Sequence, residues 1–453
     1  MEFNYNRRRF LKNSSASLAL SLLGDYGLDL YYREKKWRVG LIGCGWYGKS
    51  DLARLMQVAQ VDVVALCDPD QHHLKEAVEL VQQRLKISTS PRTYTDYRKM
   101  LAAHEFDIVV IGTPDHWHAL NMIDAVKAGA HVFVQKPVSA DVIEGEAMLA
   151  AARKYNRVVQ VGTQRRSTPH LIEAKEKIVG AGLLGNVAYV EMCCYYHMRA
   201  NGNPEVIPVP EYFDYDMWTG PAPLRPFDKL PHRGWWRTFM EYCNGIIGDM
   251  CVHMFDTVRW LLDLDWPDRV YSTGGILVQK NGKSNTPDTQ TATFEYPDLK
   301  CVWNHRSWGN PVDPEYPWAF KIYGDKGTLA GSVWKYDFTP HGDGQKLHAD
   351  VMYEKEQYPE DLTENDLELH TAPAMRRHML DFLAAIDARG KPVADIREGH
   401  ISSASCILGN VSMQLGRALE YDPVQRVVKN DPEATRLLTR NYREGWTHPT
   451  VKF

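Results

Sequence analysis

The stretch WRVGLIGCGWYGKSDLARLM (37–56) decides the fold. A short apolar run leads directly into Gly43-x-Gly45-x-x-Gly48, and a helix-period segment follows. In a strand–turn–helix unit the first glycine permits the tight turn, the second lets the backbone approach a pyrophosphate, and the third allows close helix packing. The start of the helix would offer free N–H groups to the phosphates. The stretch therefore predicts a dinucleotide site.

The next apolar run supports this prediction. VDVVALC (61–67) ends at Asp68, where a carboxylate can accept hydrogen bonds from the adenosine ribose hydroxyls. The same carboxylate would repel a 2′-phosphate, so NAD is favoured over NADP. The alternative is a structural glycine turn followed by a solvated aspartate, but the two features within one βαβ unit favour a cofactor site.

The order of apolar runs predicts two domains and the α/β class. Strands alternating with helices indicate a doubly wound parallel sheet, whereas strands that follow one another indicate an open mixed or antiparallel sheet. The first pattern covers strands 37–43, 61–67, 106–112, 130–134 and 157–162 and helices 72–85 and 142–155; the second covers strands 186–198, 269–279, 289–296, 300–308 and 317–323 and helices 374–388 and 400–418. We expect a probable export signal and linker at 1–36, an NAD-binding Rossmann domain at 37–162 and a C-terminal α/β domain with a helical end at 163–453.

The composition excludes several classes of protein. The 453 residues are 44% hydrophobic and 24% charged, which is ordinary for a globular protein. The formal net charge of -4 gives no support to a nucleic-acid partner. The eight cysteines form no Cys-x-x-Cys pair, so neither structural zinc nor a disulfide framework is expected, and we predict no metal. No apolar stretch approaches the roughly 20 residues of a membrane span.

The N-terminus resembles a twin-arginine export signal. NRRRFLKNSSASLALSLLG (6–24) joins a basic run to a short apolar segment, although no Ala-x-Ala cleavage site follows it. The alternative is a disordered basic tail. We predict periplasmic localisation by this route, and a cytoplasmic protein if the signal does not function.

Several further motifs together resemble the Gfo/Idh/MocA family, the relatives of glucose–fructose oxidoreductase and inositol dehydrogenase. They are the glycine motif, IGTPDHWH (111–118), VQKP (134–137), QVGTQRRS (160–167), GIIGDMCVHMFD (245–256) and HMLDFLAAIDARGKPVADIREGH (378–400). The resemblance covers most of the chain beyond residue 37. It implies a Rossmann domain, a C-terminal α/β domain with an open sheet, and frequent association of subunits through that sheet, so we expect a homo-oligomer.

The resemblance also assigns site residues. Lys136 matches the family's catalytic lysine, and Asp249 and His253 match its Asp-x-x-x-His pair, with His253 as the proton-transfer group. Gln135 departs from the commoner glutamate before the lysine, which removes one charge beside Lys136. The predicted cofactor-binding residues are Gly43, Gly45, Trp46, Tyr47, Gly48, Asp68, Thr113, Pro114, His118, Gln135, Lys136 and Gln164, and the predicted substrate-binding residues are Lys136, Arg165, Trp236 and His253.

The chemistry of these residue types fits hydride transfer. Oxidation of an alcohol requires removal of the hydroxyl proton as the hydride leaves, and a histidine can accept that proton at neutral pH. A lysine can stabilise the developing alkoxide. Each residue also has a simpler interpretation, because Lys136 could extend to the surface and Asp249–His253 could be a surface i,i+4 pair. His116 and His118 could be polar groups of a turn or, with no third ligand evident, a metal pair.

The aromatic residues suggest where a sugar would bind. Nine of the 13 tryptophans lie between residues 218 and 334, and RGWWR (233–237) is a candidate wall for the faces of sugar rings. Ordinary sheet packing is the alternative for each of them. Arg165, Arg166 and WNHRSW (303–308) could donate hydrogen bonds to hydroxyls, or could be solvated or ion-paired.

Three functions follow from these observations. The first is an NAD-dependent oxidoreductase acting on a secondary hydroxyl of a sugar or cyclitol. The second is a redox-neutral enzyme that cleaves glycosides and retains its NAD, as NAD-dependent glycosidases similar to this family do. Export favours a tightly bound cofactor, because free NAD is not expected outside the cytoplasm. The third is a catalytically silent sugar- or dinucleotide-binding protein, which the presence of Lys136, Asp249 and His253 disfavours.

Overall fold

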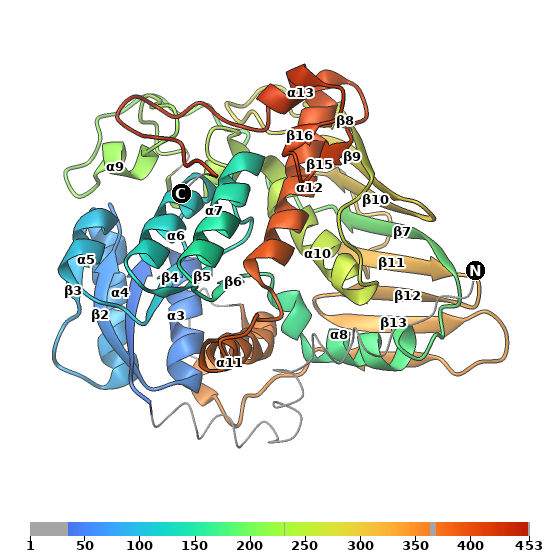
Figure 1. Ribbon diagram of the computed structural model, residues 1–453, viewed down its shortest axis with the longest axis horizontal. Helices are drawn as coiled ribbons and strands as arrows, with labels where there is room; N and C mark the ends of the chain where they lie inside the picture. The colour runs from blue at the N-terminus through green and yellow to red at the C-terminus, as the bar shows by residue number, and fades with distance from the viewer. Residues whose placement is uncertain (1–34, 231, 363–367, 452–453) are drawn as a thin grey trace.

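The computed structural model describes residues 35–230, 232–362 and 368–451. Two sheets form the framework, with helices α10 (Val252–Leu261) and α12 (Ile396–Leu415) between them, as Figure 1 shows. This arrangement confirms the predicted α/β class. The predicted export signal and most of its linker lie outside the described residues.

The first sheet is parallel and has the strand order of a Rossmann fold, β3-β2-β1-β4-β5-β6. Buried side chains cover both of its faces, with α3, α4 and α11 on one side and α5, α6 and α7 on the other. Its strands are β1 (Trp37–Ile42), β2 (Val61–Cys67), β3 (Arg92–Tyr94), β4 (Ile108–Ile111), β5 (His131–Val134) and β6 (Val159–Val161), and its helices are α3 (Trp46–Val58), α4 (Gln71–Leu85), α5 (Tyr97–Ala103), α6 (His118–Lys127) and α7 (Val142–Lys154).

The second sheet is mixed and has the order β14-β13-β12-β11-β7-β10-β9-β8, in which only β7 and β10 pair in parallel. Alternating burial along β9 and β10 places one face on a core shared with α10 and α12. The strands are β7 (Val187–Cys194), β8 (Arg269–Gly275), β9 (Thr289–Tyr296), β10 (Leu299–Arg306), β11 (Trp318–Gly324), β12 (Gly327–Ser332), β13 (Lys335–Pro340) and β14 (Leu347–Asp350). The last three were not predicted.

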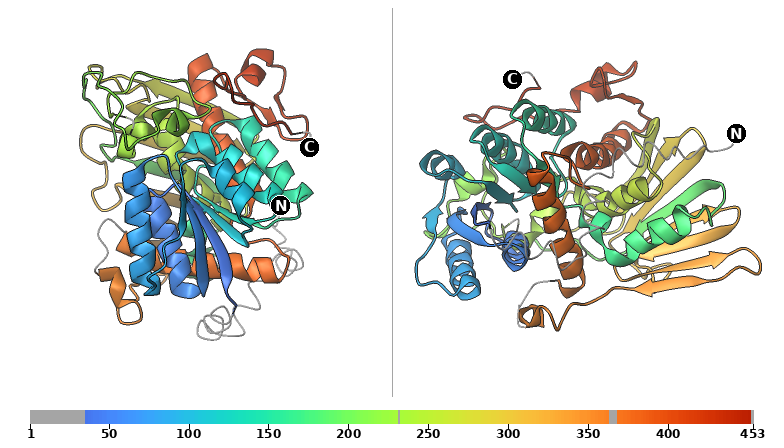
Figure 2. Two further views of the ribbon diagram at one scale, coloured as in Figure 1. Left: turned by 90° about the vertical axis from the view of Figure 1, so that its left-hand side faces the viewer. Right: turned by 60° about the horizontal axis from the view of Figure 1, so that its bottom comes forward.

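Helix α11 (Ala372–Asp387) returns from the second part of the chain to the first sheet. Its buried side chains Met379, Phe382 and Leu383 join the core formed by α3 and α4, and Figure 2 shows the helix beside the Rossmann strands. The chain between the two sheets also contains α8 (Pro169–Ala174) and α9 (Tyr215–Thr219), and after α12 come β15 (Tyr421–Asp422), β16 (Val427–Val428) and α13 (Pro432–Arg436). The two parts of the chain are therefore interlocked rather than simply linked.

Residues 199–243 form an extension that we name the aromatic lobe. Its own small core is built from Phe213, Tyr215, Trp218, Phe239 and Tyr242 together with their apolar neighbours. It reaches across to the Rossmann part, where the Trp117 indole N–H donates to the backbone oxygen of Trp218 at 2.9 Å. The lobe consequently covers the loop that follows β4.

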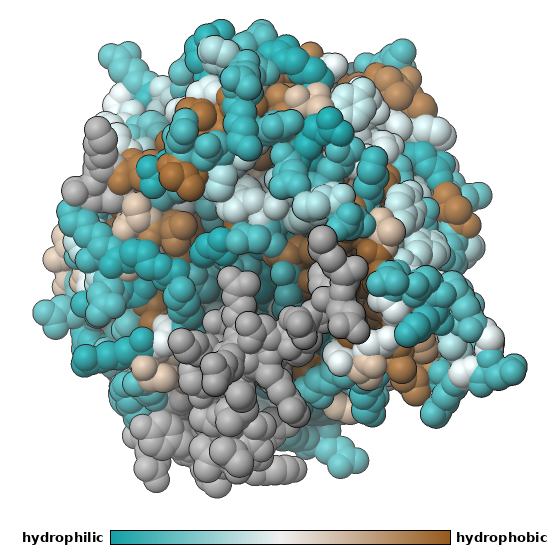
Figure 3. All heavy atoms as spheres, turned by 45° about the vertical axis from the view of Figure 1, so that its right-hand side comes forward, coloured by the Kyte–Doolittle hydropathy of each residue, from teal (hydrophilic) through white to brown (hydrophobic). Residues whose placement is uncertain are grey.

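The surface carries no dominant apolar region on the face drawn in Figure 3, where hydrophobic side chains occur in small groups among hydrophilic ones. None of the helices in the described part of the chain combines the length and the apolar character needed to cross a bilayer.

Candidate active site

A cavity of about 1150 Å³ lies between the carboxyl ends of the parallel strands, the aromatic lobe and the second sheet. Thirteen of the predicted site residues line it, namely Gly43, Gly45, Trp46, Tyr47, Asp68, Thr113, Pro114, Gln135, Lys136, Arg165, Trp236, Asp249 and His253. Three predicted residues lie behind the wall instead, namely Gly48, His118 and Gln164. The carboxyl ends of parallel strands are where open α/β sheets bind their ligands.

The glycine motif forms the turn between β1 and α3. Gly43 has φ +88°, and a Cβ there would meet the backbone of Gly112 at 2.6 Å, so only glycine fits. Gly45 caps α3 and has open space where a side chain would stand. A Cβ on Gly48 would lie 2.0 Å from the backbone oxygen of Gly43. The turn therefore leaves backbone and helix N–H groups accessible from the cavity, which fits a dinucleotide pyrophosphate.

Asp68 follows β2 and marks the other end of the cofactor part of the cavity. One carboxylate oxygen accepts from the Cys44 N–H at 2.8 Å, and the second accepts from the Asp70 N–H at 2.8 Å. His73 Nδ1 lies 3.5 Å from the latter oxygen. A carboxylate has about four lone-pair positions, so Asp68 retains acceptor capacity for ribose hydroxyls. Its position fits the group expected there.

Two of the residues that do not line the cavity, His118 and Gln164, contact residues near the cavity wall. Both nitrogens of the His118 ring contact backbone oxygens, that of Pro137 at 2.7 Å and that of Thr113 at 2.9 Å. Burial lowers the pKa of His118 to about 4, so the imidazole is neutral. Gln164 donates to the Tyr47 hydroxyl at 3.0 Å. These contacts account for His118 as a structural group that ties the β4 and β5 loops together.

Gln135 interacts with a buried acid. Its amide donates to Asp51 Oδ2 at 2.7 Å, and burial raises the pKa of Asp51 well above its ordinary value. The glutamine thus occupies a position where a second carboxylate would meet Asp51.

Lys136 and Asp249 form the centre of the site. Lys136 Nζ lies 2.5 Å from Asp249 Oδ1 and donates to the Asp249 backbone oxygen at 2.9 Å. Arg237 Nε lies 3.5 Å from the same carboxylate oxygen. Burial raises the pKa of Asp249, but the charges of Lys136 and Arg237 outweigh it, so the pKa is lowered and the group is ionised. The lysine at the end of β5 is thus held inside the cavity rather than directed to the surface.

His253 lies beside this pair but is not bonded to it. Its ring is 4% exposed and packs edge-on against Trp318, with 5.4 Å between the ring centroids, and its Nδ1 has no hydrogen-bond partner. Burial, and then the charges of Lys136 and Arg165, lower its pKa well below the ordinary value. His253 is therefore a neutral imidazole at neutral pH, with the capacity to accept a proton.

The backbone around this pair differs from the predicted α-helix. Asp249 lies in a π-helical turn (Ile247–Cys251), and His253 lies in the first turn of α10. Wide turns of this kind occur often at functional sites, and they change the angle between residues four apart. Both side chains nevertheless line the same cavity.

The aromatic residues divide into two groups. Trp218, Trp236, Trp318 and Trp334 line the cavity, whereas Trp303 is fully buried in the core of the second sheet. The other tryptophans of the cluster (235, 260, 266 and 308) do not line the cavity either.

The same division separates the basic residues. Arg165 lines the cavity, and its guanidinium lies over the Trp318 ring at 5.4 Å. Arg166 instead forms a buried ion pair with Asp256, at 2.7 and 2.9 Å. No residue of 303–308 lines the cavity. Arg166 and the WNHRSW stretch are therefore structural, and Arg165 alone of these faces the cavity.

Several titratable residues of the cavity wall were missed by sequence reasoning, among them Asp115, Arg237, Glu368 and His370. Asp115 lies inside the motif IGTPDHWH, and Arg237 lies inside the stretch RGWWR. Both could therefore have been predicted from the sequence as site residues. Burial raises the pKa of Asp115 to about 8, although the charge of Lys136 opposes this effect, and its carboxyl is therefore protonated at neutral pH. Glu368 and His370 come from a polar stretch with no recognisable pattern.

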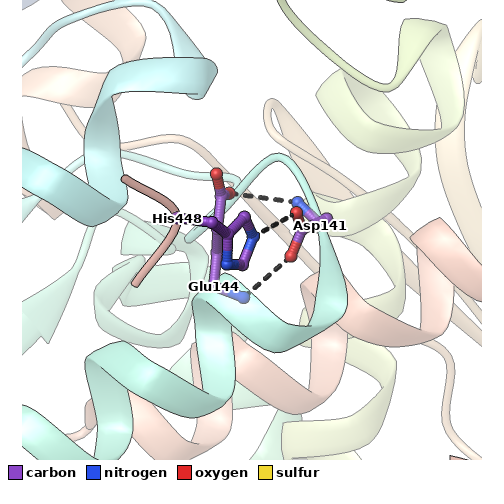
Figure 4. Close-up of side chains that lie close together, drawn as sticks. All are labelled: Asp141, Glu144 and His448. Carbon is purple, nitrogen blue, oxygen red and sulfur yellow. Dashed lines mark hydrogen bonds and ion pairs between the residues drawn. The ribbon is translucent and has the colours of Figure 1, made fainter. Parts of the chain in front are cut away.

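A separate cluster of ligand-type side chains joins α7 to the C-terminal tail. Figure 4 shows Asp141, Glu144 and His448 together, with their ligand atoms within 4.8 Å of one another. Asp141 and Glu144 form a capping box at the start of α7, and His448 Nε2 lies 2.8 Å from Asp141 Oδ2. Tyr442 donates to Glu144 at 2.5 Å. These contacts show that the cluster caps helix α7 and binds the C-terminal segment that contains Tyr442 and His448.

The fold and the cavity define a dinucleotide-binding oxidoreductase with a Rossmann domain and a second α/β domain. Residues 37–163 match the oxidoreductase family with an NAD-binding Rossmann fold, and residues 172–301 and 350–448 match the C-terminal alpha/beta domain of the same family. The chain belongs to the Gfo/Idh/MocA oxidoreductase family. This confirms the resemblance read from the motifs.

Curated relatives are distant. An uncharacterised oxidoreductase, YrbE, from Bacillus subtilis is 26% identical over 294 residues, which cover 64% of this chain and 72% of the relative. A glycosyl hydrolase family 109 protein from Shewanella baltica is 26% identical over 240 residues, covering 44% of this chain and 52% of the relative. An alpha-N-acetylgalactosaminidase from Shewanella oneidensis is 29% identical over 187 residues, covering 37% and 41%. The match thus spans about half or less of the glycosidase relatives.

Solved structures share the fold. Levoglucosan dehydrogenase in complex with NADH and levoglucosan superposes with a TM-score of 0.63 at 19% identity, covering 85% of this chain and 99% of that one. The aldose-aldose oxidoreductase from Caulobacter crescentus gives 0.63 at 17% identity, covering 85% and 100%.

Proposed function

We propose that the protein is an NAD-dependent oxidoreductase acting on a secondary hydroxyl of a sugar, sugar derivative or cyclitol. The observation that carries this proposal is the convergence of Lys136, Asp249 and His253 on the cavity that the glycine turn and Asp68 also line. Family membership and the sugar ligands named for the levoglucosan dehydrogenase structures, levoglucosan and L-sorbose, support it.

Bound NAD would accept a hydride from the alcohol carbon. The neutral His253 would take the hydroxyl proton, which is supported by its place on the cavity wall and by the lack of a hydrogen-bond partner for its Nδ1 among the described residues. Lys136 would donate a hydrogen bond to the developing alkoxide, and the ionised Asp249 holds its Nζ in place. Asp68 would bind the adenosine ribose, which favours NAD over NADP because a 2′-phosphate would face a carboxylate.

We further propose that the cofactor is held tightly. The aromatic lobe contacts the adenosine side of the cavity, where His232 Nε2 lies 2.9 Å from Asp70 Oδ2 and the His72 and Tyr212 rings stack at 3.9 Å. The lobe would have to move for a dinucleotide to leave. The test is to purify the full chain without added cofactor, denature it, and quantify NAD and NADH by mass spectrometry. Near-stoichiometric cofactor is expected; an empty protein would contradict tight binding.

The oxidoreductase assignment has its own test. Reduction of bound or added NAD is followed at 340 nm with a panel of hexoses, methyl glycosides, uronic acids and inositols. At least one sugar or cyclitol is expected to give NADH. The absence of both NADH and bond cleavage across the panel would argue for the silent binding protein.

A redox-neutral glycoside-cleaving enzyme is the second candidate, favoured by the sequence match to family 109 glycosidases. Such an enzyme would release aglycone from a nitrophenyl glycoside without net NADH. Cleavage accompanied by a constant 340 nm absorbance would select this candidate over a dehydrogenase.

We also propose periplasmic export by the twin-arginine route and self-association through the open face of the second sheet. Tyr189 and Tyr271 on that face are 40% and 41% exposed, which is high for aromatic side chains on strands. Fusion of residues 1–36 to a reporter that is active only after folded export tests the first proposal. Light scattering of the purified chain and of a Tyr189→Lys variant tests the second, with a smaller mass expected for the variant.

A further inference from the structure

The Arg165 guanidinium is a buried cation that has no ion-pair partner among the residues that the structure describes. The residue is 2% exposed, and its Nε and Nη1 atoms have no hydrogen-bond acceptor. Within the described chain, no carboxylate forms an ion pair with it. Buried charges in proteins are normally paired, because an isolated ion loses its hydration without compensation. The arrangement therefore leaves a place for a negative charge that the protein does not supply.

The position of Arg165 assigns that place to the substrate. Arg165 follows β6, the strand next to β5, whose end carries Lys136. The guanidinium lies over one ring, Trp318, which His253 also contacts, at 5.4 Å in each case. The pyrophosphate turn and Asp68 lie at other strand ends, after β1 and β2. A charge bound by Arg165 would thus belong to the molecule that His253 deprotonates.

The remaining charges of this end of the cavity do not neutralise Arg165. Asp249 is committed to Lys136 and Arg237. Glu368 lines the cavity beyond ion-pair distance of Arg165; burial raises the pKa of Glu368, and the charges of Arg165 and Lys136 oppose this effect. The protonated Asp115 contributes no charge at neutral pH. Asp249 and Glu368 therefore share this part of the cavity with three cationic side chains, and neither carboxylate forms an ion pair with Arg165.

We propose that Arg165 binds a carboxylate group of the substrate, so that the substrate class is an acidic sugar with its carboxylate on the ring that carries the reacting hydroxyl. This inference rests on the proposed sugar oxidoreductase function. A planar guanidinium presents two parallel N–H groups that match the two oxygens of a carboxylate. Hydroxyl groups alone would satisfy its hydrogen bonds but would leave its charge uncompensated. Arg165 and His253 each lie 5.4 Å from the centre of the Trp318 ring. The acidic group bound by Arg165 would therefore lie close to the carbon whose hydroxyl His253 deprotonates.

The experiment measures binding rather than turnover. Full-length protein is loaded with NADH, which prevents oxidation of an alcohol, and is titrated calorimetrically with matched pairs of methyl glycosides and methyl glycosiduronic acids of glucose, galactose and mannose. Arg165→Gln removes the charge, and Arg165→Lys keeps the charge but lacks the two parallel N–H groups of the guanidinium. Arg306→Gln is the matched control, because Arg306 does not line the cavity. NADH content and the circular dichroism spectrum are recorded for each variant.

For one of the pairs, the wild type and Arg306→Gln are expected to bind the uronic acid at least about 10-fold more tightly than the neutral sugar. Arg165→Gln is expected to abolish this preference while NADH content stays as in the wild type, and Arg165→Lys is expected to retain part of the preference. Equal or weaker binding of the uronic acids by the wild type would overturn the inference and leave the sugar function standing. A higher affinity for a sugar 6-phosphate than for the uronic acid would also overturn the carboxylate assignment. If no sugar of either kind binds to NADH-loaded protein, both the inference and the proposed function fail.

Discussion

Replacing Lys136 by methionine should abolish catalysis while leaving the cofactor bound. The side chain is 11% exposed, and its ammonium lies in the cavity, 2.5 Å from Asp249. Loss of one preorganised donor to a developing oxyanion costs about 10²- to 10³-fold in kcat, and loss of a group that assists proton transfer adds at least about tenfold. We therefore expect kcat to fall by about 10³-fold or more, equivalent to about 4 kcal/mol of transition-state stabilisation.

The assay follows NADH formation at 340 nm with the sugar that gives the highest rate in the panel, and cofactor content is measured on the same preparation. Asp249 becomes a buried carboxylate with Arg237 as its remaining partner, so the double variant Lys136→Met/Asp249→Asn controls for misfolding. Lys321→Met is a matched control, because Lys321 pairs with Asp313 outside the cavity. More than about a tenth of wild-type kcat in a fully loaded Lys136→Met protein would refute the reasoning, since oxyanion donors contribute far more than that.

Four other outcomes follow from the same structure. Asp68→Asn should weaken NAD binding by roughly 10-fold or more by removing a charged acceptor, and should reduce the discrimination against NADP; calorimetry with both cofactors measures this. Because the pKa of His253 is lowered, kcat/KM should stay level as pH falls through 6.5, and an acid limb at 6.5 would contradict the neutral-imidazole assignment. An alkaline limb near pH 8 should disappear in Asp115→Asn, because Asp115 has a pKa of about 8. The pKa of Glu144 is raised to about 7 and that of His448 is also raised, so both groups bind more protons in the folded state, and the tail contact should weaken as pH rises from about 4.5 through 7. Hydrogen exchange of residues 439–450, corrected for intrinsic rates, should therefore be faster at pH 8 than at pH 6 in the wild type, and this difference should be smaller in His448→Gln.

The Rossmann half was predictable from local sequence because its signals are local. The strand before Gly43, the glycine spacing and the aspartate after β2 all act within one βαβ unit, and β1 and β2 begin at the residues expected. Strands β12 to β14 were not predicted, because each is only four to six residues long and contains glycine, proline or aspartate, which are uncommon in strands. The amphipathic helix 374–388 was recognised, but its docking on α3 depends on packing between residues more than 300 apart, which periodicity does not encode.

The same distinction applies to the site. Lys136 and Asp249 were identified from motifs, yet the contact between them brings together residues 113 apart in the chain. Arg237 contacts Asp249 from the aromatic lobe, and Glu368 lines the cavity from a polar loop. Neither residue lies in a stretch whose hydrophobic periodicity predicts its position. The π-helical turn at Asp249 was also invisible, because its sequence, IGDMC, suits an ordinary helix as well.

Electrostatics explains how one small cluster can hold a base and an oxyanion donor side by side. Burial and the charges of Lys136 and Arg165 act in the same direction on His253, keeping it neutral and able to accept a proton. Asp249 responds in the opposite sense, because Lys136 and Arg237 stabilise its carboxylate, and that carboxylate holds the Lys136 ammonium where we propose that an alkoxide would form. If Arg165 is neutralised by an acidic substrate, one of the two charges that depress the pKa of His253 is compensated, and the imidazole becomes a stronger base when that substrate binds. Recognition of the acidic group would then also activate the proton acceptor, and a neutral sugar in the same cavity would meet a weaker base.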